Sequence, residues 1–474
     1  MPNKPTVSTL NANSVGILNA IRNNASMEYF QAVPAAENTT DSIRDVGKAI
    51  MAYQPRMNEF INALVNRIAL VRVTSRMYTN PWAFAKKGVL NFGETIEEVF
   101  VDIANAHPFD PVDAVSTVYQ RNIPNVMTMF HAMNLQTLYP VTISQQQLRQ
   151  AFLSLDGVTD LIARIVNSLY SAMNYDEFIM MKYVIARLAL DGCIKNNAIT
   201  AVTTQATAEA AIIDMKAITN KFGFMSSDYT ISGNMNFVDG DNLYVITTAD
   251  FDAITDVDVL AKAFNMDRAN WMGRHISVDS FGFNDGELAR LDMLLEDDPQ
   301  YVSTNKITTT YNNALKTITA LACDVNFLQV YDVLNEFTEN YNGKGLYWNE
   351  FLHAWRIYSA SPFVDVVMFS STANSVTSIS LANSTGSTTI SAPSSGQPDK
   401  RVQFTATVTA GQFTNKGVTW SVAKTTGQTG QTGAPTIDQN GLLTLHAGDA
   451  GKWTVTATSV ADGTVTGTSN LTIS

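Results

Sequence analysis

The chain has 474 residues, of which 45% are hydrophobic and 16% charged, enough for about three domains with sizeable cores. Its formal net charge of −12 excludes a protein whose main function is to bind nucleic acid, because binding of the phosphate backbone requires many lysine and arginine residues. Two distant cysteines give neither a disulfide framework nor a zinc motif, which indicates a reducing cytoplasm. We expect neither a secretory signal nor a membrane helix, which needs ~20 apolar residues.

Two extended segments around a proline-rich tip predict a long hairpin over residues 82–141. The outgoing arm holds Val99 and Val101, the tip is His-Pro-Phe-Asp-Pro at 107–111, and the chain returns through residues 126–130. A hairpin of that length cannot bury its own apolar side chains. We therefore expect it to lie against another surface, which we interpret as another chain.

Apolar residues at a spacing of 3.6 predict a helix over residues 158–190, ended by Asp191-Gly192. At 1.5 Å per residue it spans roughly 50 Å, which exceeds a small domain and predicts a spine for other elements. A break near Asn174 is the alternative.

A buried strand is predicted at 243–248, after which Thr247 and Asp250 form a start signal for a helix that continues to Phe264. Further strands are predicted at 275–278, 327–331 and 364–369.

The composition changes near residues 371–376, since all 18 methionines precede this point and threonine then fills about a fifth of the positions. Segments after it alternate by twos, as in residues 402–408 and 453–458, and Asn-Gly and Asp-Gly turns separate them. This pattern predicts a β-sandwich of about 100 residues. A disordered linker is the alternative, but it would leave Trp420 and Trp453 with nothing to pack against.

Motifs for catalysis and metal binding are absent from the sequence. The five histidines are scattered, and there is no H-E-x-x-H, phosphate-binding loop or G-x-S-x-G elbow. Acidic clusters at 94–98, 256–258 and 296–298 lack calcium-loop spacing and are typical of exposed surfaces and helix starts. We expect no enzyme activity, no cofactor and no metal site. The residues favour a self-assembling structural protein.

Four segments resemble the major capsid proteins of phi-29-like short-tailed phages, in the family's order. They are DVDVLAKAFNMDRANWMG at 256–273, GLYWNEFLHAWRIYSASPFVDVVMF at 345–369, FGETIEEVFVDI at 92–103 and PNVMTMFH at 124–131. The resemblance implies the α+β Hong Kong 97-type capsid fold. Its parts would be the N-terminal arm and start of the peripheral domain at 1–81, the E-loop at 82–141, the peripheral domain with its spine helix at 142–235, a mainly axial domain at 236–324, and a return to the peripheral domain at 325–370.

Residues 376–474 resemble a bacterial group 2 immunoglobulin-like domain, through VQFTA at 402–406, VTWS at 418–421, IDQNGLLT at 437–444 and TVTAT at 454–458. The resemblance implies an all-β immunoglobulin-like sandwich displayed outside a shell, where a host surface or a glycan would be its contact.

The resemblance implies a major head protein that assembles through hexamers and pentamers into an icosahedral or prolate shell. The shell would form in the host cytoplasm, become the virion capsid, and enclose double-stranded DNA without sequence-specific binding. A scaffolding protein and a portal protein are the implied partners, and no membrane is involved. An encapsulin-like compartment shell and a bacterial surface adhesin are the alternatives.

Contacts between subunits are expected from the E-loop. The expected apolar contacts are Ile96, Val99, Val101, Phe109, Met127 and Met129. Glu97 and Glu98 are expected to pair with lysine or arginine across the interface.

Overall fold

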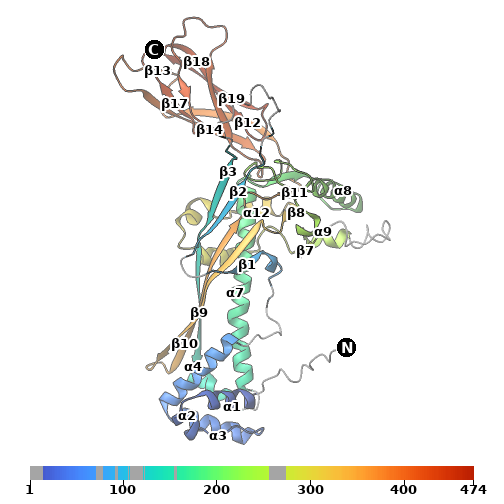
Figure 1. Ribbon diagram of the computed structural model, residues 1–474, viewed down its shortest axis with the longest axis vertical. Helices are drawn as coiled ribbons and strands as arrows, with labels where there is room; N and C mark the ends of the chain where they lie inside the picture. The colour runs from blue at the N-terminus through green and yellow to red at the C-terminus, as the bar shows by residue number, and fades with distance from the viewer. Residues whose placement is uncertain are drawn as a thin grey trace. The chain divides into compact units, whose positions relative to one another are not determined.

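A computed structural model (Figure 1) describes residues 14–70, 78, 80–90, 94–104, 106, 121, 123–153, 157–255 and 274–474. The chain divides into two compact units. The first comprises Met1–Val99, Met127–Met181 and Leu328–Ala360, and the second comprises Phe100–Val126, Lys182–Phe327 and Ser361–Ser474. The division passes through one long helix and through the two strands of a hairpin, and each unit is described by itself.

The first unit is built on a four-stranded sheet with the order β1-β9-β10-β4. Its strands are β1 (Lys86–Val89), β9 (Leu328–Asn342), β10 (Tyr347–Ala360) and β4 (Leu135–Ser144). β10 is antiparallel to both β9 and β4, while β1 runs parallel to β9. Alternate residues of β10, among them Trp348, Leu352 and Ala354, are buried in the core of this unit.

Helices supply the rest of that core. They are α1 (Ser14–Asn24), α2 (Met27–Ala32), α3 (Thr40–Met51), α4 (Gln54–Leu70) and α6 (Gln145–Ala151), followed by α7 (Gly157–Leu190). In α3 the helical spacing brings Ile43, Val46 and Ile50 to one buried face. The helix predicted over residues 158–190 is confirmed as α7, and it continues through Asn174 without the break considered as an alternative.

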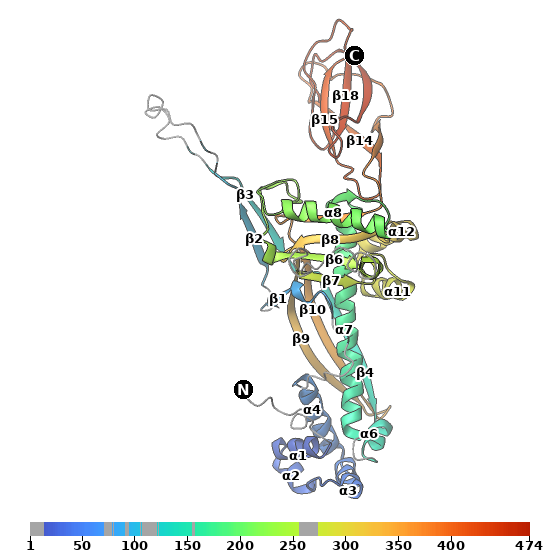
Figure 2. The same cartoon turned by 90° about the vertical axis from the view of Figure 1, so that its right-hand side faces the viewer.

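The hairpin consists of β2 (Ile96–Val101) and β3 (Val126–His131), which form a two-stranded sheet of their own (Figure 2). The Asp102 N–H donates to the Asn125 carbonyl at 2.9 Å just beyond the strands. The predicted range 82–141 also contains a 3-10 turn, η2 (Ala83–Ala85), together with β1 and most of β4, which are strands of the four-stranded sheet. Phe109 lies outside the described residues.

The second unit contains a five-stranded sheet with the order β5-β11-β8-β6-β7. Its strands are β5 (Lys195–Ala198), β11 (Val366–Ser370), β8 (Ile318–Asp324), β6 (Leu243–Thr248) and β7 (Arg274–Val278). Its helical elements are α8 (Gln205–Lys221), η3 (Gly240–Asn242), α9 (Ala249–Ile254), α11 (Asp285–Leu294), η6 (Tyr301–Asn305) and α12 (Thr309–Leu315). Val245, Ala322 and Val367 from three adjacent strands pack with α8 in one core.

The predicted helix-start signal after β6 is wrong. α9 begins one residue later than the signal requires, with Thr248 at its N-cap and no side-chain cap bond. The Thr247 hydroxyl is engaged elsewhere, at 2.7 Å from Asp252 Oδ1 and 2.6 Å from His275 Nε2. A tertiary partner has therefore displaced the local cap. The continuation of that helix to Phe264 lies outside the described residues.

The C-terminal part of the second unit is a two-sheet β-sandwich (Figure 1). One sheet has the order β12-β14-β17-β16, from β12 (Val376–Asn383), β14 (Lys400–Ala410), β17 (Leu442–Leu445) and β16 (Thr436–Ile437). The other has the order β13-β19-β18-β15, from β13 (Thr389–Ile390), β19 (Thr466–Ile473), β18 (Gly451–Ser459) and β15 (Val418–Lys424). Trp420 and Trp453 are buried in the shared core, so the disordered-linker alternative is wrong.

Among the described residues, no helix is both long enough and apolar enough to cross a membrane.

A buried carboxyl lies in the core of the first unit. Glu350 on β10 is 1% exposed and is directly opposite Glu339 on β9. Burial, together with the negative charge of Glu339, raises the pKa of Glu350 to about 8. In the second unit, burial and the neighbouring Asp324 raise the pKa of Asp365 to about 7. Folding therefore favours the protonated form of both groups.

We predict that Glu350→Gln flattens the dependence of stability on pH. The folded chain holds this proton more tightly than the unfolded chain, so stability falls as pH rises from the ordinary pKa of 4.5 to about 8. Glutamine resembles the neutral carboxyl. Above that pH the free energy of unfolding of the variant should therefore be about 1–2 kcal/mol higher than that of the parent. Urea unfolding of the unassembled chain between pH 5 and pH 9 measures this. Equal pH slopes for the two chains would contradict the account, since Asp365 contributes the same slope to both.

Candidate assembly surface

The outer face of the hairpin is exposed and largely apolar. Alternation along β2 and β3 turns six side chains outward: Glu97, Val99, Val101, Val126, Thr128 and Phe130. Val101 is 55% exposed and Phe130 63% exposed, although both are large apolar side chains. A two-stranded ribbon has no second layer to cover such a face. The face is therefore suited to binding another surface, and we call these six residues the outer face.

The opposite face turns inward and is half-buried. It carries Ile96, Glu98, Phe100, Met127 and Met129, and it ends at the buried His131. The Phe100 ring stacks on Phe363, with ring centroids 5.7 Å apart. The predicted contact residues are thus divided. Glu97, Val99 and Val101 lie on the outer face, whereas Ile96, Glu98, Met127 and Met129 lie on the inner one.

The hairpin is fastened at its base by His131. The Nδ1 atom of this ring lies 2.5 Å from Ser359 Oγ, and its Nε2 atom lies 3.1 Å from Glu98 Oε2. Asn134 exchanges two hydrogen bonds with the Tyr358 backbone, at 2.6 and 2.9 Å. Glu98 thus has a partner in its own chain, where the sequence led us to expect one in a neighbour.

A network of four buried or half-buried charges holds the segment that leads into the hairpin. Glu177 on α7 forms ion pairs with Lys86, at 3.1 Å, and with Arg356, at 3.0 Å. Asp332 on β9 forms ion pairs with the same two cations, at 3.2 Å from Lys86 and 2.7 Å from Arg356. Two cations are thus matched by two carboxylates. The network joins α7, β1, β9 and β10.

The residues just before β1 are fixed to the same helix. The Asn80 side chain donates to Glu177 Oε1 at 2.9 Å and accepts from the Trp82 N–H at 2.9 Å. The Trp82 ring is fully buried and packs against Phe178 at 5.2 Å between centroids. The chain therefore enters the hairpin from a fixed point on α7.

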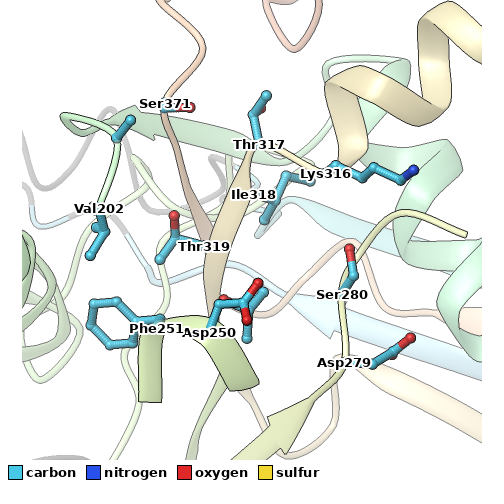
Figure 3. A pocket seen from close by; sticks show the side chains of 12 residues that line it. Val202, Asp250, Phe251, Asp279, Ser280, Lys316, Thr317, Ile318, Thr319 and Ser371 are labelled. Carbon is cyan, nitrogen blue, oxygen red and sulfur yellow. The ribbon is translucent and has the colours of Figure 1, made fainter. Parts of the chain in front are cut away.

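A groove of about 430 Å³ with mixed polar and apolar lining opens at one end of the five-stranded sheet. Figure 3 shows Val202 and Phe251 on one side of it and Lys316 and Asp279 on the other. Neither the groove nor any other part of the described chain gathers three or more histidine, cysteine, aspartate or glutamate side chains suited to a metal. The acidic cluster at 256–258 lies outside the described residues, and Asp297 and Asp298 are exposed.

The comparison with known families bears directly on this arrangement. Residues 18–370 match the sequence model of the Phi29-like phage major capsid proteins. The chain belongs to this family. As a phage major capsid protein it forms the capsid shell, and its place is the virion. The family match decides against the encapsulin-like and adhesin alternatives.

Individual relatives extend the match. The chain is 33% identical to the major capsid protein of Bacillus phage B103 over 451 residues, which is 94% of this chain and 90% of the relative. It is 31% identical to that of Bacillus phage PZA, with the same coverage of 94% and 90%. Residues 1–370 fall short of 94% of the chain, so both alignments continue into the C-terminal sandwich.

Chains from solved phage structures are similar at lower sequence identity. A chain of the structure of the head fiber and inner core protein gp22 of native bacteriophage P68 aligns with a TM-score of 0.48 and 13% identity, over 64% of this chain and 87% of that one. A chain of the Staphylococcus phage Andhra capsid aligns with a TM-score of 0.47 and 14% identity, over 64% and 86%.

We predict that Glu177→Gln destabilises the capsid protein by about 3 kcal/mol or more, because it leaves the buried Arg356 and the partly exposed Lys86 with one carboxylate between them. Urea unfolding of the unassembled chain measures the loss. Glu336→Ala is the matched control, since Glu336 is an exposed carboxylate on β9 and its removal should change stability by less than about 0.5 kcal/mol. A loss from Glu177→Gln no larger than that of the control would contradict the assigned role of the network.

Proposed function

We propose that this major capsid protein builds its shell from hexamers and pentamers, and that the β2–β3 hairpin is the E-loop that crosses onto the neighbouring subunit. The observation that carries the proposal is the exposed apolar outer face on a hairpin whose base is fastened to its own chain. Burial of apolar surface is worth roughly 25 cal/mol per Å², so each hairpin gains stability when a neighbour covers it.

The proposed contact between a hairpin and the neighbouring subunit is of the kind that can build a ring. A hairpin that binds a different surface of the next copy makes a heterologous contact, and heterologous contacts close into rings when the rotation between copies permits. Each subunit then contributes one hairpin and receives one. Individual contacts can be weak, because a subunit held at several points dissociates far more slowly than one held at a single point.

We assign the residues to the domains of the Hong Kong 97-type fold as follows. Residues 1–81 form the N-terminal arm and start of the peripheral domain, which residues 142–235 and 325–370 complete, and residues 236–324 form most of the axial domain. Two features support this assignment. The first unit holds most of α7 against a long sheet, and the second unit holds a separate five-stranded sheet.

The charge distribution suits a container for double-stranded DNA. Residues 376–474 contain five lysines and arginines against four aspartates and no glutamate, so the net charge of −12 comes from the remainder of the chain. An acidic inner wall repels phosphate and leaves packaged DNA free to move. A scaffolding protein and a portal protein complete the proposed set of partners, and the chain itself acts as structure without catalysis.

We assign the C-terminal sandwich to the outside of the shell as an immunoglobulin-like domain. Its outward-facing residues are rich in hydroxyl groups, as at Thr419, Ser421, Thr466 and Thr468. Neutral hydroxyls can donate to and accept from the hydroxyls of a glycan. A host surface or its glycans are therefore the proposed contact.

We predict that Val101→Asp abolishes shell formation while the chain still folds, because the new carboxylate would be buried against the neighbour without a partner. Negative-stain electron microscopy with a co-expressed scaffolding protein measures assembly, and circular dichroism checks folding. Val460→Asp is the matched control, because Val460 is 55% exposed, as Val101 is, and lies in the sandwich. Normal shells from Val101→Asp would remove the E-loop assignment.

We predict that a chain ending at Ser375 forms shells as the full chain does, because the sandwich has its own core and its own two sheets. Particle yield and diameter by electron microscopy measure this. Failure of the shortened chain to form shells, under conditions in which the full chain assembles, would contradict an external and dispensable sandwich.

A further inference from the structure

An exposed aromatic surface lies in the second unit, just after α8. Phe224 is 73% exposed, Met225 49% and Phe237 47%. A two-way backbone bridge joins Ser226 to Asn236, with both N–H to carbonyl distances at 3.0 Å. The bridge holds Met225 and Phe237 on adjacent backbone segments. We call Phe224, Met225 and Phe237 the aromatic ledge.

A free cation lies beside the ledge. Lys221 is the last residue of α8, and its carbonyl accepts the Phe224 N–H at 3.0 Å. Its side chain is exposed and has no hydrogen-bond or ion-pair partner among the described residues. The ledge therefore combines apolar area with an unpaired positive charge.

The outer face of the hairpin has the complementary composition. Glu97 is exposed and, within the described chain, has neither an ion pair nor a hydrogen bond, in contrast to Glu98. It alternates with Val99 and Val101 along β2, so the unpaired negative charge lies on the same face as the apolar side chains.

We propose that the outer face of one copy docks on the aromatic ledge of the adjacent copy, with Glu97 paired to Lys221. The proposal rests on the proposed function and names the surface that receives the hairpin. The occupant is a second copy because each surface places exposed apolar side chains beside one charge without a partner in the described chain, Glu97 on the hairpin and Lys221 at the ledge. The two surfaces are also different, which is what a ring-forming contact requires.

Other exposed apolar positions of the second unit fit less well. Met293 and Val302 lie near Lys306 in sequence, but Lys306 is already paired with Asp292 at 2.8 Å. In the first unit, Lys344 is an exposed cation, but the one large apolar exposed side chain near it in sequence is Leu346. The ledge joins three large apolar side chains to a free lysine.

A charge exchange tests the pairing. We expect Glu97→Lys and Lys221→Glu each to lower the yield of shells at least about fivefold, because each places like charges together at every contact. The double variant restores opposite charges in reverse order, and its yield should return to within about twofold of the parent. Lys344→Glu is the matched control, since it reverses an exposed lysine of the first unit that is not part of the ledge, and it should assemble normally. Sedimentation and electron microscopy measure the yield, and circular dichroism verifies folding.

The outcomes separate this inference from the proposed function. Loss in both single variants with recovery in the double variant supports the docking. Normal assembly of Lys221→Glu, or loss without recovery in the double variant, overturns it. In either of those cases a failure of Val101→Asp to assemble leaves the E-loop role standing, whereas normal shells from Val101→Asp remove that role as well.

Discussion

The buried charge network at the root of the hairpin is the constraint on which the rest of the assembly surface depends. Lys86 lies at the start of β1, and Glu177 and Asp332 bind it to α7 and β9. Arg356 closes the network from β10. Charges removed from water are tolerated only when they are paired, so these elements can move relative to one another only at a large cost in free energy. The chain that enters the hairpin therefore starts from a fixed position.

Because its root is fixed, the hairpin has one face held by its own chain and one face left exposed. His131, Asn134 and the stacked Phe100 fasten the inner face and the end of β3, whereas nothing in the described chain covers Val101 and Phe130. Folding leaves this apolar face in water, and assembly is the step that can bury it. In the proposed assembly the subunit folds first, and the apolar outer face of the hairpin is buried only when a neighbouring subunit covers it.

The sequence predicted those parts of the fold that depend on local periodicity. The helix at 158–190, the strand at 243–248 and the two-sheet sandwich all follow from repeated spacing of apolar residues. The same rule, applied strictly, would have divided the hairpin residues, because Ile96 and Val99 differ by an odd number of positions and cannot share a face. Phe130 was not among the expected contact residues, although the same alternation places it on the outer face, two positions from Thr128.

Features that arise between distant segments could not be predicted. Lys86, Glu177, Asp332 and Arg356 are separated by up to 270 positions, and no local pattern marks them as partners. Alternation separates Glu97 and Glu98 onto opposite faces, but only the tertiary structure places Glu98 beside His131. The displaced cap at Thr247 has the same origin, since a contact with His275 outweighs a local bond.

The most direct test of the account is a cryo-electron microscopy reconstruction of assembled shells, in which the surroundings of Val101 and Phe130 can be seen. The account predicts that both side chains are covered by the adjacent subunit of the same ring, while His131 keeps its contacts within its own chain. A hairpin folded back on its own subunit, or an outer face left open to solvent in the shell, would contradict it.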